Sequence, residues 1–241
     1  MSDESGIQNL SWLGGSSLSF YSWPAIQQHP LGLDFPPLKL AGGVLHPSHP
    51  ARLYICGITP YDSTHLGHAA TYLTFDLLVR YLLCSGSRVS FIENITDIDD
   101  PLLERAERDR VDWRELAHDQ VNLFKSDMTR LHVTPPQALV PVTYVMNDVI
   151  RAISLLVDKG FTYKLGNDIY FTIEKFLDEL PLELDQAIGI FRERGGDPDR
   201  DGKKHPLDPL LWKSRSENDP FWPSLLGDGR PGWHIECTVI S

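Results

Sequence analysis

Residue types able to do chemistry gather in one short stretch, "CGITPYDSTHLGHAATY", residues 56–72. His65 and His68 stand three residues apart around Gly67, where a helical pattern begins, and Cys56 ends a strand-like segment upstream. In an open α/β sheet, ligands bind at the carboxyl ends of strands, where helix N-termini present free backbone N–H groups. Imidazoles placed there donate hydrogen bonds to phosphate oxygens and stabilise charge that grows in a transition state. A His-x-x-His pair alone is equally compatible with plain helix capping, so the motif by itself leaves both interpretations open.

The elements that must position these residues alternate between strands and helices. Apolar runs predict strands over 51–56, 88–94 and 138–143. Helical spacing predicts a helix from Gly67, one after the acidic turn 97–100, one beyond it, and one that stops at Gly160. The first of these helices is expected to be buried on two sides, through the stripes Ala70, Leu73, Leu77, Tyr81 and Phe75, Leu78, Leu82. The third is expected to bury Ala117, Val121, Phe124, Met128 and Leu131. The alternation predicts an α/β fold with a sheet that is parallel at its core.

The segments on either side of this core do not show the same alternation of strands and helices. Residues 1–45 are rich in Ser, Gly and Pro without a sustained period, which predicts a partly disordered N-terminal extension before a domain over 46–241. Residues 161–173 predict a hairpin that turns at Gly166-Asn167, and 174–230 are expected to be loop-rich, so about 161–230 is expected to be an insertion. "GWHIECTVIS" is expected to begin a strand, and its position at the last residue predicts that the chain is a fragment of something longer.

Composition narrows the class of protein. The net charge of −11, from 22 basic and 33 acidic residues, argues against broad capture of nucleic acid. No apolar run reaches the roughly 18 residues of a membrane span, and the acidic start is unlike a secretory signal, so we expect a cytoplasmic protein. Three cysteines are too few for a disulfide framework. Cys84 fits a buried apolar position, whereas Cys56 and Cys237 lie beside His and Gly clusters.

Three separated motifs carry a resemblance to a known family. "HLGH" at 65–68 resembles the HIGH motif of class I aminoacyl-tRNA synthetases, and "YICGITPYD", "FIENITDIDDPLLERA" and "GRPGWHIEC" resemble their cysteinyl branch. The expected fold is therefore the Rossmann-like, HUP-type parallel sheet of that class with an inserted connective region. Cysteinyl-tRNA synthetases usually carry "CGPTVYD" where this chain has "CGITPYD". "ERGGDP" at 193–198 and "LDPLLWKS" make the chain more similar to the mycothiol cysteine ligases of actinobacteria.

The resemblance implies an ATP-dependent reaction in two steps. L-cysteine is activated to cysteinyl-adenylate by ATP with Mg²⁺, and the amine of glucosaminyl-inositol then attacks the activated carbonyl. His65 and His68 would hold the reacting α-phosphate, and Gly67 would allow adenosine to lie against the backbone. Other contacts with cysteine and adenylate map onto Gly57, Ile58, Thr59, Thr71, Asn94, Ile95, Thr96 and Trp233, with Cys56 beside them. We expect no tRNA or membrane partner, and a monomer for the full-length protein. A cysteinyl-tRNA synthetase and a non-catalytic, nucleotide-binding remnant are the alternatives.

One zinc ion would separate cysteine from serine, because zinc prefers a soft thiolate to a hydroxyl. The family pattern maps two of its ligands onto Cys56 and Cys237, although their separation is no zinc motif by itself. The family continues beyond "GWHIEC" to a ligating histidine and a KMSKS loop, so we expect this polypeptide alone to bind zinc weakly and to ligate poorly.

The function of the remaining motifs is harder to infer from their residues. The run Glu193, Arg194, Gly195, Gly196, Asp197, Pro198 predicts a tight turn, in which Arg194 is assigned equally to inositol hydroxyls or to an ion pair. "DIDD" at 97–100 is interpreted as helix-start acids that complement the helix dipole rather than as a magnesium site. His234 is expected to make a structural hydrogen bond.

Overall fold

The structure is a computed structural model that describes residues 38–40, 43–46, 50–217 and 219–241. Most of the predicted extension, residues 1–45, lies outside these ranges. Its described part contains two short antiparallel strands, β1 (Lys39–Leu40) and β2 (Gly43–Val44). The chain divides into two compact units, one formed by Met1–Ile95 with Arg105–Val140 and the other by Thr96–Glu104 with Pro141–Ser241.

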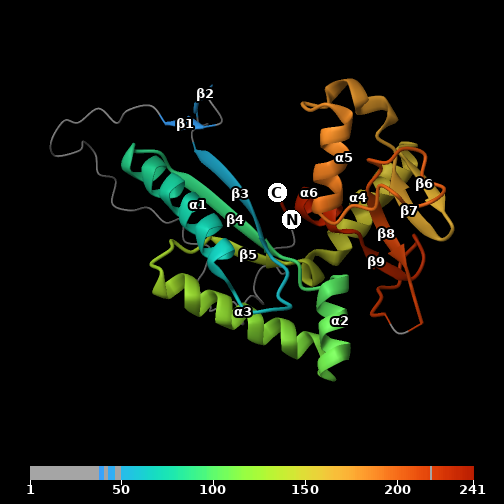
Figure 1. Cartoon of the computed structure of the whole chain (residues 1–241), viewed down its shortest axis with the longest axis horizontal. Coiled ribbons are helices and arrows are strands. Elements are labelled where there is room, and N and C mark those ends of the chain that lie inside the picture. The colour runs from blue at the N-terminus through green and yellow to red at the C-terminus, as the bar shows by residue number, and fades with distance from the viewer. Residues whose placement is uncertain (1–37, 41–42, 47–49, 218) are drawn as a thin grey trace, which may run out of the picture. The chain divides into compact units, whose positions relative to one another are not determined.

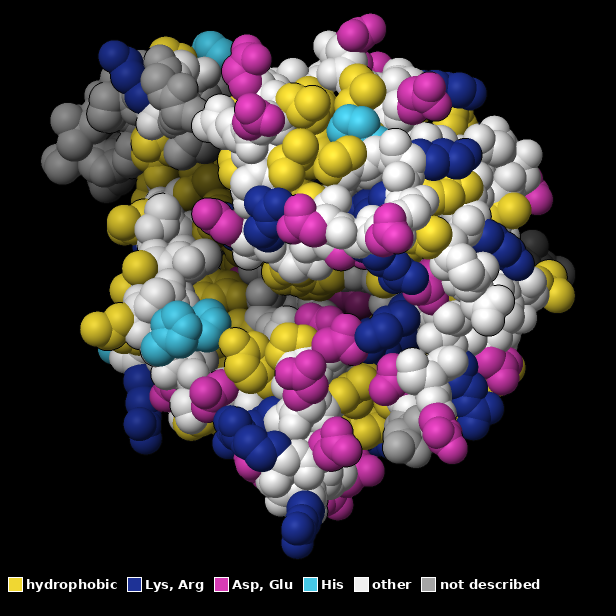
Figure 2. All heavy atoms as spheres, turned by 45° about the vertical axis from the view of Figure 1, so that its right-hand side comes forward, with side chains coloured by type: hydrophobic (Ala, Val, Ile, Leu, Met, Phe, Trp, Pro, Cys, Tyr) yellow, Lys and Arg dark blue, Asp and Glu magenta, His cyan; other side chains and the backbone are white. Residues whose placement is uncertain are grey.

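On the face drawn in Figure 2, acidic and basic groups are interspersed, and no broad basic area stands out. Within the described ranges, no helix is both long enough and apolar enough to cross a membrane.

The first unit is built on a three-stranded sheet (Figure 1). Its order is β3 (Ala51–Ile58), β4 (Val89–Ile95), β5 (Ala138–Pro141), and β3 and β4 run parallel with Ala51 opposite Val89. Helix α1 (Leu66–Cys84) connects β3 to β4. Helices α2 (Asp100–Asp109) and α3 (Trp113–Arg130) follow, and the chain divides between the two units within α2. The predicted strands, the crossover helix and the parallel pairing are confirmed.

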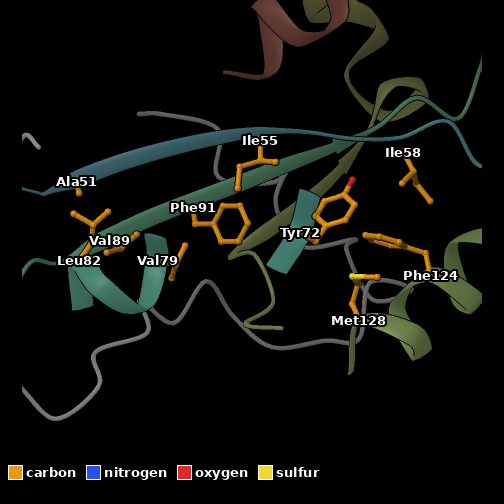
Figure 3. Close-up of a cluster of buried hydrophobic side chains, with 10 residues drawn as sticks. All are labelled: Ala51, Ile55, Ile58, Tyr72, Val79, Leu82, Val89, Phe91, Phe124 and Met128. Carbon is orange, nitrogen blue, oxygen red and sulfur yellow. The ribbon is translucent and has the colours of Figure 1, made fainter. Parts of the chain in front are cut away.

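The core of this unit joins both strands to α1 and α3. Figure 3 shows Ile55 of β3 and Phe91 of β4 near Tyr72 of α1, with Phe124 and Met128 of α3 on the same side of the sheet. Tyr72 meets Phe124 edge to face, with ring centroids 4.9 Å apart. Such aromatic pairs add to the stabilisation that buried apolar area provides. The predicted buried face of α3 is confirmed except at Leu131, which caps the helix and is 40% exposed.

Two apolar stripes were expected to bury α1: the first is mostly wrong, whereas the second is supported, because Leu82 is buried and Phe75 and Leu78 are half-buried against the core. Its buried residues are Tyr72, Asp76, Val79 and Leu82, whereas Ala70, Leu73 and Leu77 of the first expected stripe are exposed. The buried line contains an acid, which a reading of apolar spacing places on the solvent side. Asp76 is 6% exposed, and its carboxylate accepts hydrogen bonds from Arg80 at 2.6 Å and from the backbone N–H of Thr134 at 2.8 Å. Although burial opposes ionisation, these donors hold the pKa of Asp76 below its usual value.

The second unit is built on an antiparallel sheet of order β6-β7-β8-β9. Its strands are β6 (Thr162–Leu165), β7 (Asp168–Phe171), β8 (Leu210–Ser214) and β9 (Gly229–Pro231). The helices are η3 (Val142–Val145) and η4 (Glu174–Glu179), which are 3-10, and α4 (Met146–Asp158), α5 (Leu184–Glu193) and α6 (Trp233–Ile240). The hairpin at Gly166-Asn167 and the left-handed Gly160 that follows α4 are confirmed.

Two expectations for this unit are wrong. Residues 174–230 are not simply loop-rich, because they contain α5 and two strands of the sheet. Residues 233–240 form a helix rather than the start of a strand. Periodicity cannot distinguish a short apolar run in a strand from one in a buried helix. Here the hydroxyl of Thr238 donates to the carbonyl of His234 one turn back, and Ile235 and Glu236 are buried together, so packing selects the helix.

The observed burial of α1 gives a matched pair of substitutions. Leu82→Ala removes a side chain that is 1% exposed, so we expect the free energy of unfolding to fall by about 2–5 kcal/mol. Leu77→Ala, on the same helix at 69% exposure, is expected to change it by less than about 0.5 kcal/mol. Urea unfolding of both variants checks this, and equal losses would contradict the observed face.

Candidate functional site

The loop between β3 and α1 is fixed at both of its ends. Arg105 forms an ion pair with Asp62 at 3.3 Å and donates to the carbonyl of Tyr61 at 3.3 Å. Closer to the helix, the hydroxyl of Thr64 donates to Asp127 of α3. The chain therefore enters α1 in a defined position.

The two predicted histidines form a reciprocal cap at the start of α1. His65 is the N-cap residue, and its Nδ1 accepts from the backbone N–H of Gly67 at 3.0 Å. His68 reaches back, so that its Nδ1 accepts from the backbone N–H of His65 at 3.3 Å. The rings lie 4.1 Å apart between centroids. This is the geometry of a capping box with imidazoles in place of the usual hydroxyl and carboxylate.

The cap determines what the imidazoles can donate. Because each Nδ1 accepts a backbone hydrogen bond, a neutral ring carries its hydrogen on Nε2. Burial, and then the neighbouring His65, lower the pKa of His68, which favours that neutral form. A Cβ on Gly67 would lie 2.8 Å from a carbon of the His65 ring, so glycine allows the ring to fold over the helix start. The geometry provides two N–H donors beside free helix amides, an arrangement that suits an anionic group.

The end of β3 is joined to the end of β4 by Asn94. Its Oδ1 accepts from the backbone N–H of Gly57 and from the hydroxyl of Tyr54, each at 2.9 Å. A Cβ on Gly57 would lie 1.6 Å from the carbonyl oxygen of Asn94, so no larger residue fits there. Cys56, the neighbour of Gly57, is exposed, and its carbonyl accepts from the hydroxyl of Tyr72 at 3.4 Å.

Other predicted contact residues differ in what they can offer a ligand. Ile58 is 6% exposed and belongs to the core cluster, and Ile95 is fully buried, so only their backbones could meet a ligand. Thr59 is half-buried. Thr71 is exposed, and its hydroxyl donates to the carbonyl of Gly67 at 3.1 Å. Thr96, in the second unit, is 2% exposed and hydrogen-bonds to Glu236.

Sequence reasoning missed a buried acid in β4. Glu93 is 2% exposed, and its burial raises its pKa from 4.5 to about 8. It acts electrostatically on Tyr72, whose own pKa is raised first by burial and then by Glu93 and Cys56. The available signal was an acid inside the apolar run "SFIEN". Glu93 is therefore an uncharged carboxyl group near neutral pH, close to the end of β3.

In the second unit, the "ERGGDP" motif forms the turn after α5. Gly195 has a φ of +78°, and a Cβ there would lie 2.6 Å from the ring of Trp233. A Cβ on Gly196 would lie 2.4 Å from the ring of Phe191. Both glycines are thus required for the turn backbone to pack on aromatic rings. Asp197 fixes the turn, because its carboxylate accepts from Tyr170 at 2.5 Å and from Lys203 at 2.9 Å.

This turn borders a cavity of about 250 Å³ within the second unit. Its lining includes Asp99, Asp100, Gly195, Gly196, Asp197, Lys213, Arg230, Trp233 and His234. Glu193 and Arg194 are exposed residues outside this lining, and Pro198 is buried. For Arg194, no ion pair with any described acid is found, so the predicted pairing has no support. The Nε2 of His234 likewise has no hydrogen-bond partner among the described residues, and its ring stacks on Phe191.

A zinc site is not formed by the described residues alone. No group of three or more His, Cys, Asp or Glu side chains that could hold a metal occurs within 38–40, 43–46, 50–217 and 219–241. Cys56 belongs to the first unit and the half-buried Cys237 to the second. The two thiols remain a predicted pair of ligands.

Comparison with known proteins identifies the family. Residues 44–241 match the family described as tRNA synthetases class I (C) catalytic domain. The chain belongs to this family, and the matched range includes the parallel β3-α1-β4 unit with its capped histidine pair.

The curated relatives are more specific. A protein named L-cysteine:1D-myo-inositol 2-amino-2-deoxy-alpha-D-glucopyranoside ligase, from Streptosporangium roseum, is 52% identical over 214 residues, 85% of this chain and 53% of that protein. Ligases with the same base name from Corynebacterium urealyticum and Corynebacterium jeikeium are 54% and 47% identical, over 78% and 92% of this chain and 48% and 57% of their own lengths. The chain thus spans about half the length of the curated relatives it matches.

Glu93 makes the stability of the chain depend on pH. Its pKa is higher in the folded protein than the ordinary 4.5, so between that value and about 8 the folded state binds more protons than the unfolded state. The free energy of unfolding is therefore expected to fall as pH rises through this window, by at most about 1.4 kcal/mol per pH unit. Glu93→Gln should flatten this dependence, whereas Glu107→Gln, at an exposed site on α2, should preserve it. Urea unfolding across the window measures both, and equal slopes for Glu93→Gln and the unsubstituted chain would refute the assignment.

Proposed function

We propose that the chain provides the catalytic domain of an ATP-dependent ligase that joins L-cysteine to the amine of glucosaminyl-inositol in mycothiol biosynthesis. The observation that carries the proposal is the identity of 47–54% to ligases of that name over most of this chain. The capped histidine pair supports it, because it provides donors for a phosphate where the family binds ATP.

The proposed chemistry has two displacements. A carboxylate oxygen of cysteine attacks the α-phosphorus of ATP, and pyrophosphate leaves as the bond between the α-phosphorus and the bridging oxygen breaks. The amine nitrogen then attacks the acyl carbon, the acyl–oxygen bond breaks, AMP leaves, and the nitrogen loses a proton. Neither step needs a covalent bond to the protein, so positioning and electrostatic stabilisation are what the protein must supply.

In this proposal His65 and His68 act on the α-phosphate. Their Nε2–H groups donate to its oxygens as negative charge grows in the transition state, while their Nδ1 atoms hold the helix cap. Gly67 permits the close approach of the nucleotide. Each such donor is worth roughly 10²–10³ in rate in comparable sites.

We assign the cysteine substrate to the backbone and small polar groups that the family pattern indicates. These are the backbone groups of Gly57, Ile58 and Thr59, the hydroxyl of Thr71, and the Asn94, Ile95 and Thr96 segment, with the indole of Trp233 as a wall. The side chain of Asn94 is already engaged with Gly57 and Tyr54. Its proposed part is therefore to shape the site rather than to contact substrate.

We further propose that a zinc ion selects the cysteine thiol. Zinc would bind the substrate as a thiolate, which a hydroxyl cannot replace. The support is the soft donor set of Cys56 and Cys237 together with the family match. Two thiols do not complete a tetrahedral shell, so no step above depends on the ion.

The alternatives differ in the acceptor. A cysteinyl-tRNA synthetase would transfer the same cysteinyl group to tRNA, whereas a nucleotide-binding remnant would transfer it to nothing. The net charge of −11 and the mixed charges in Figure 2 disfavour a nucleic-acid acceptor. An assay that offers tRNA and glucosaminyl-inositol together separates the three possibilities, and transfer to tRNA would remove our proposal. We expect this chemistry in the cytoplasm.

The histidine pair gives a direct test of the activation step. His65→Asn keeps an N-cap side chain but removes one Nε2–H donor, so we expect cysteine-dependent ATP–pyrophosphate exchange to fall by about 10²-fold. Affinity for cysteinyl-sulfamoyl-adenosine, measured by calorimetry, should fall too and does not require turnover. His118→Asn, at an exposed histidine on α3, is the matched control and should change neither quantity. Unchanged affinity of His65→Asn for the adenylate analogue would contradict the assigned role.

Zinc ligation is tested without turnover. In competition with a chromophoric chelator, Cys56→Ser and Cys237→Ser should each weaken zinc binding by about tenfold or more, because a hydroxyl is a poor zinc ligand. Cys84, which the sequence predicted to be buried, is instead exposed, because it ends α1. Cys84→Ser is therefore the control at an exposed thiol and should leave the affinity unchanged. Equal affinities for all three variants would show that these thiols do not bind the ion.

A further inference from the structure

Apart from Trp233, which is also assigned as a wall of the cysteine site, the residues that line the cavity of the second unit have no part in the activation step as derived above. The lining contains three acids and three bases: Asp99, Asp100 and Asp197, and Arg200, Lys213 and Arg230. Burial lowers the pKa of His234, so this histidine adds no positive charge near neutral pH. Burial also raises the pKa of Asp99, which reduces the negative charge of the lining. The cavity therefore has many hydrogen-bonding groups and no surplus of negative charge.

The charged groups of the lining hold one another in place, but not all of their hydrogen-bonding capacity is used. Lys213 contacts both carboxylate oxygens of Asp100, at 2.8 and 3.0 Å, and Arg230 also donates to Asp100. Arg230 is 3% exposed, and its Nε has no hydrogen-bond partner among the described residues. A buried donor without a partner costs about 1–3 kcal/mol, so a ligand that accepts from it would be favoured.

The cavity also has an aromatic wall. Gly195 and Gly196 bring the turn backbone against Trp233 and Phe191, and His234 stacks on Phe191 with centroids 5.2 Å apart. Trp233 is 37% exposed, so part of its ring is open to a ligand. An indole face in a cavity that also has hydrogen-bond donors and acceptors suits a ring with C–H bonds on its faces and hydroxyls around its edge.

The volume and the net charge of the cavity limit which ligands it can bind. Small-molecule sites commonly measure about 300–1,000 Å³, so a cavity of about 250 Å³ takes one ring and not a nucleotide. An ammonium group would require a surplus of negative charge in the lining, which three acids against three bases do not give, and phosphate is therefore kept as a rival probe. A neutral polyol ring, in which every hydroxyl both donates and accepts, matches this lining.

We infer that this cavity is the subsite for the inositol ring of the acceptor. The assignment rests on the proposed function, because the acceptor is taken from it. It also explains the "ERGGDP" turn: the two glycines bring it against the aromatic wall, and Asp197, held by Tyr170 and Lys203, keeps it in place.

The test measures binding to the whole chain with free myo-inositol as the probe, by calorimetry and saturation-transfer NMR. Methyl 2-amino-2-deoxy-α-D-glucopyranoside and inorganic phosphate are the rival probes. We expect myo-inositol to bind, and Lys213→Met and Asp99→Asn each to weaken it by about tenfold or more, the effect of losing one hydrogen bond to a charged group. Lys204→Met is the matched control, because Lys204 is exposed in the same unit and lies outside the cavity lining, and it should leave the affinity unchanged.

Each outcome decides the inference. Thermal unfolding of every variant identifies any that loses its fold, and Asp99→Asn, which keeps an oxygen for the backbone N–H of Asp100, remains if Lys213→Met fails. Binding of the aminosugar or phosphate but not of myo-inositol, or no binding of any probe, overturns it. Affinity for cysteinyl-sulfamoyl-adenosine, measured in parallel, needs neither an acceptor nor turnover. If this analogue does not bind and myo-inositol still binds, the proposed function fails and the polyol subsite stands; if the analogue binds and myo-inositol does not, only the subsite fails.

Discussion

The close approach of two strand ends is the constraint on which the candidate site depends. Gly57 lies so near the carbonyl of Asn94 that a single methyl group would overlap it, and the Asn94 side chain also holds the backbone N–H of Gly57. The pairing register of β3 and β4 shifts between Ile55 and Ile58, at this same point. Because the strands are joined there, Cys56 and the loop into α1 begin from a fixed position. The histidines at the far end of that loop are placed by it and by the contacts of Arg105 and Thr64.

The buried acidic side chains fall into two kinds, according to whether their surroundings lower or raise their pKa. Asp76 and Asp168 are buried acids whose donors keep them ionised, and they join separate segments of the chain. Glu93 and Glu236 are buried acids whose pKa values are raised by burial, so that they favour the uncharged form. Ionised acids with donors stabilise a fold, whereas uncharged buried carboxyl groups cost stability as pH rises. The second kind lies at the end of β4 and in α6, next to residues assigned to substrate, as is common where a site takes precedence over stability.

The sequence predicted the elements better than their faces. Alternating apolar segments were enough for β3, α1, β4 and the hairpin, because each has a local signal in its spacing or its turn residues. The buried face of α1 was predicted only in part because Asp76 lies in it, and an acid is buried only where distant donors, here Thr134, meet it. Helix α6 was missed because eight residues with four β-branched side chains carry no decisive period. The histidine pair was found from its spacing, but its cap was not, since a ring nitrogen's partner depends on backbone geometry. The cavity was beyond prediction, as its lining comes from four separate stretches of the chain.

The turn at Gly195 and Gly196 is possible because neither residue has a Cβ atom. The clashes they avoid are with the rings of Trp233 and Phe191, both in the second unit. A one-base change to alanine at either codon would narrow or distort the cavity while leaving the paired imidazoles as they are. The ligand preference of this cavity can therefore change in evolution independently of the histidine pair at the start of α1. A change of ligand need not be preceded by loss of the chemistry that the histidine pair supports.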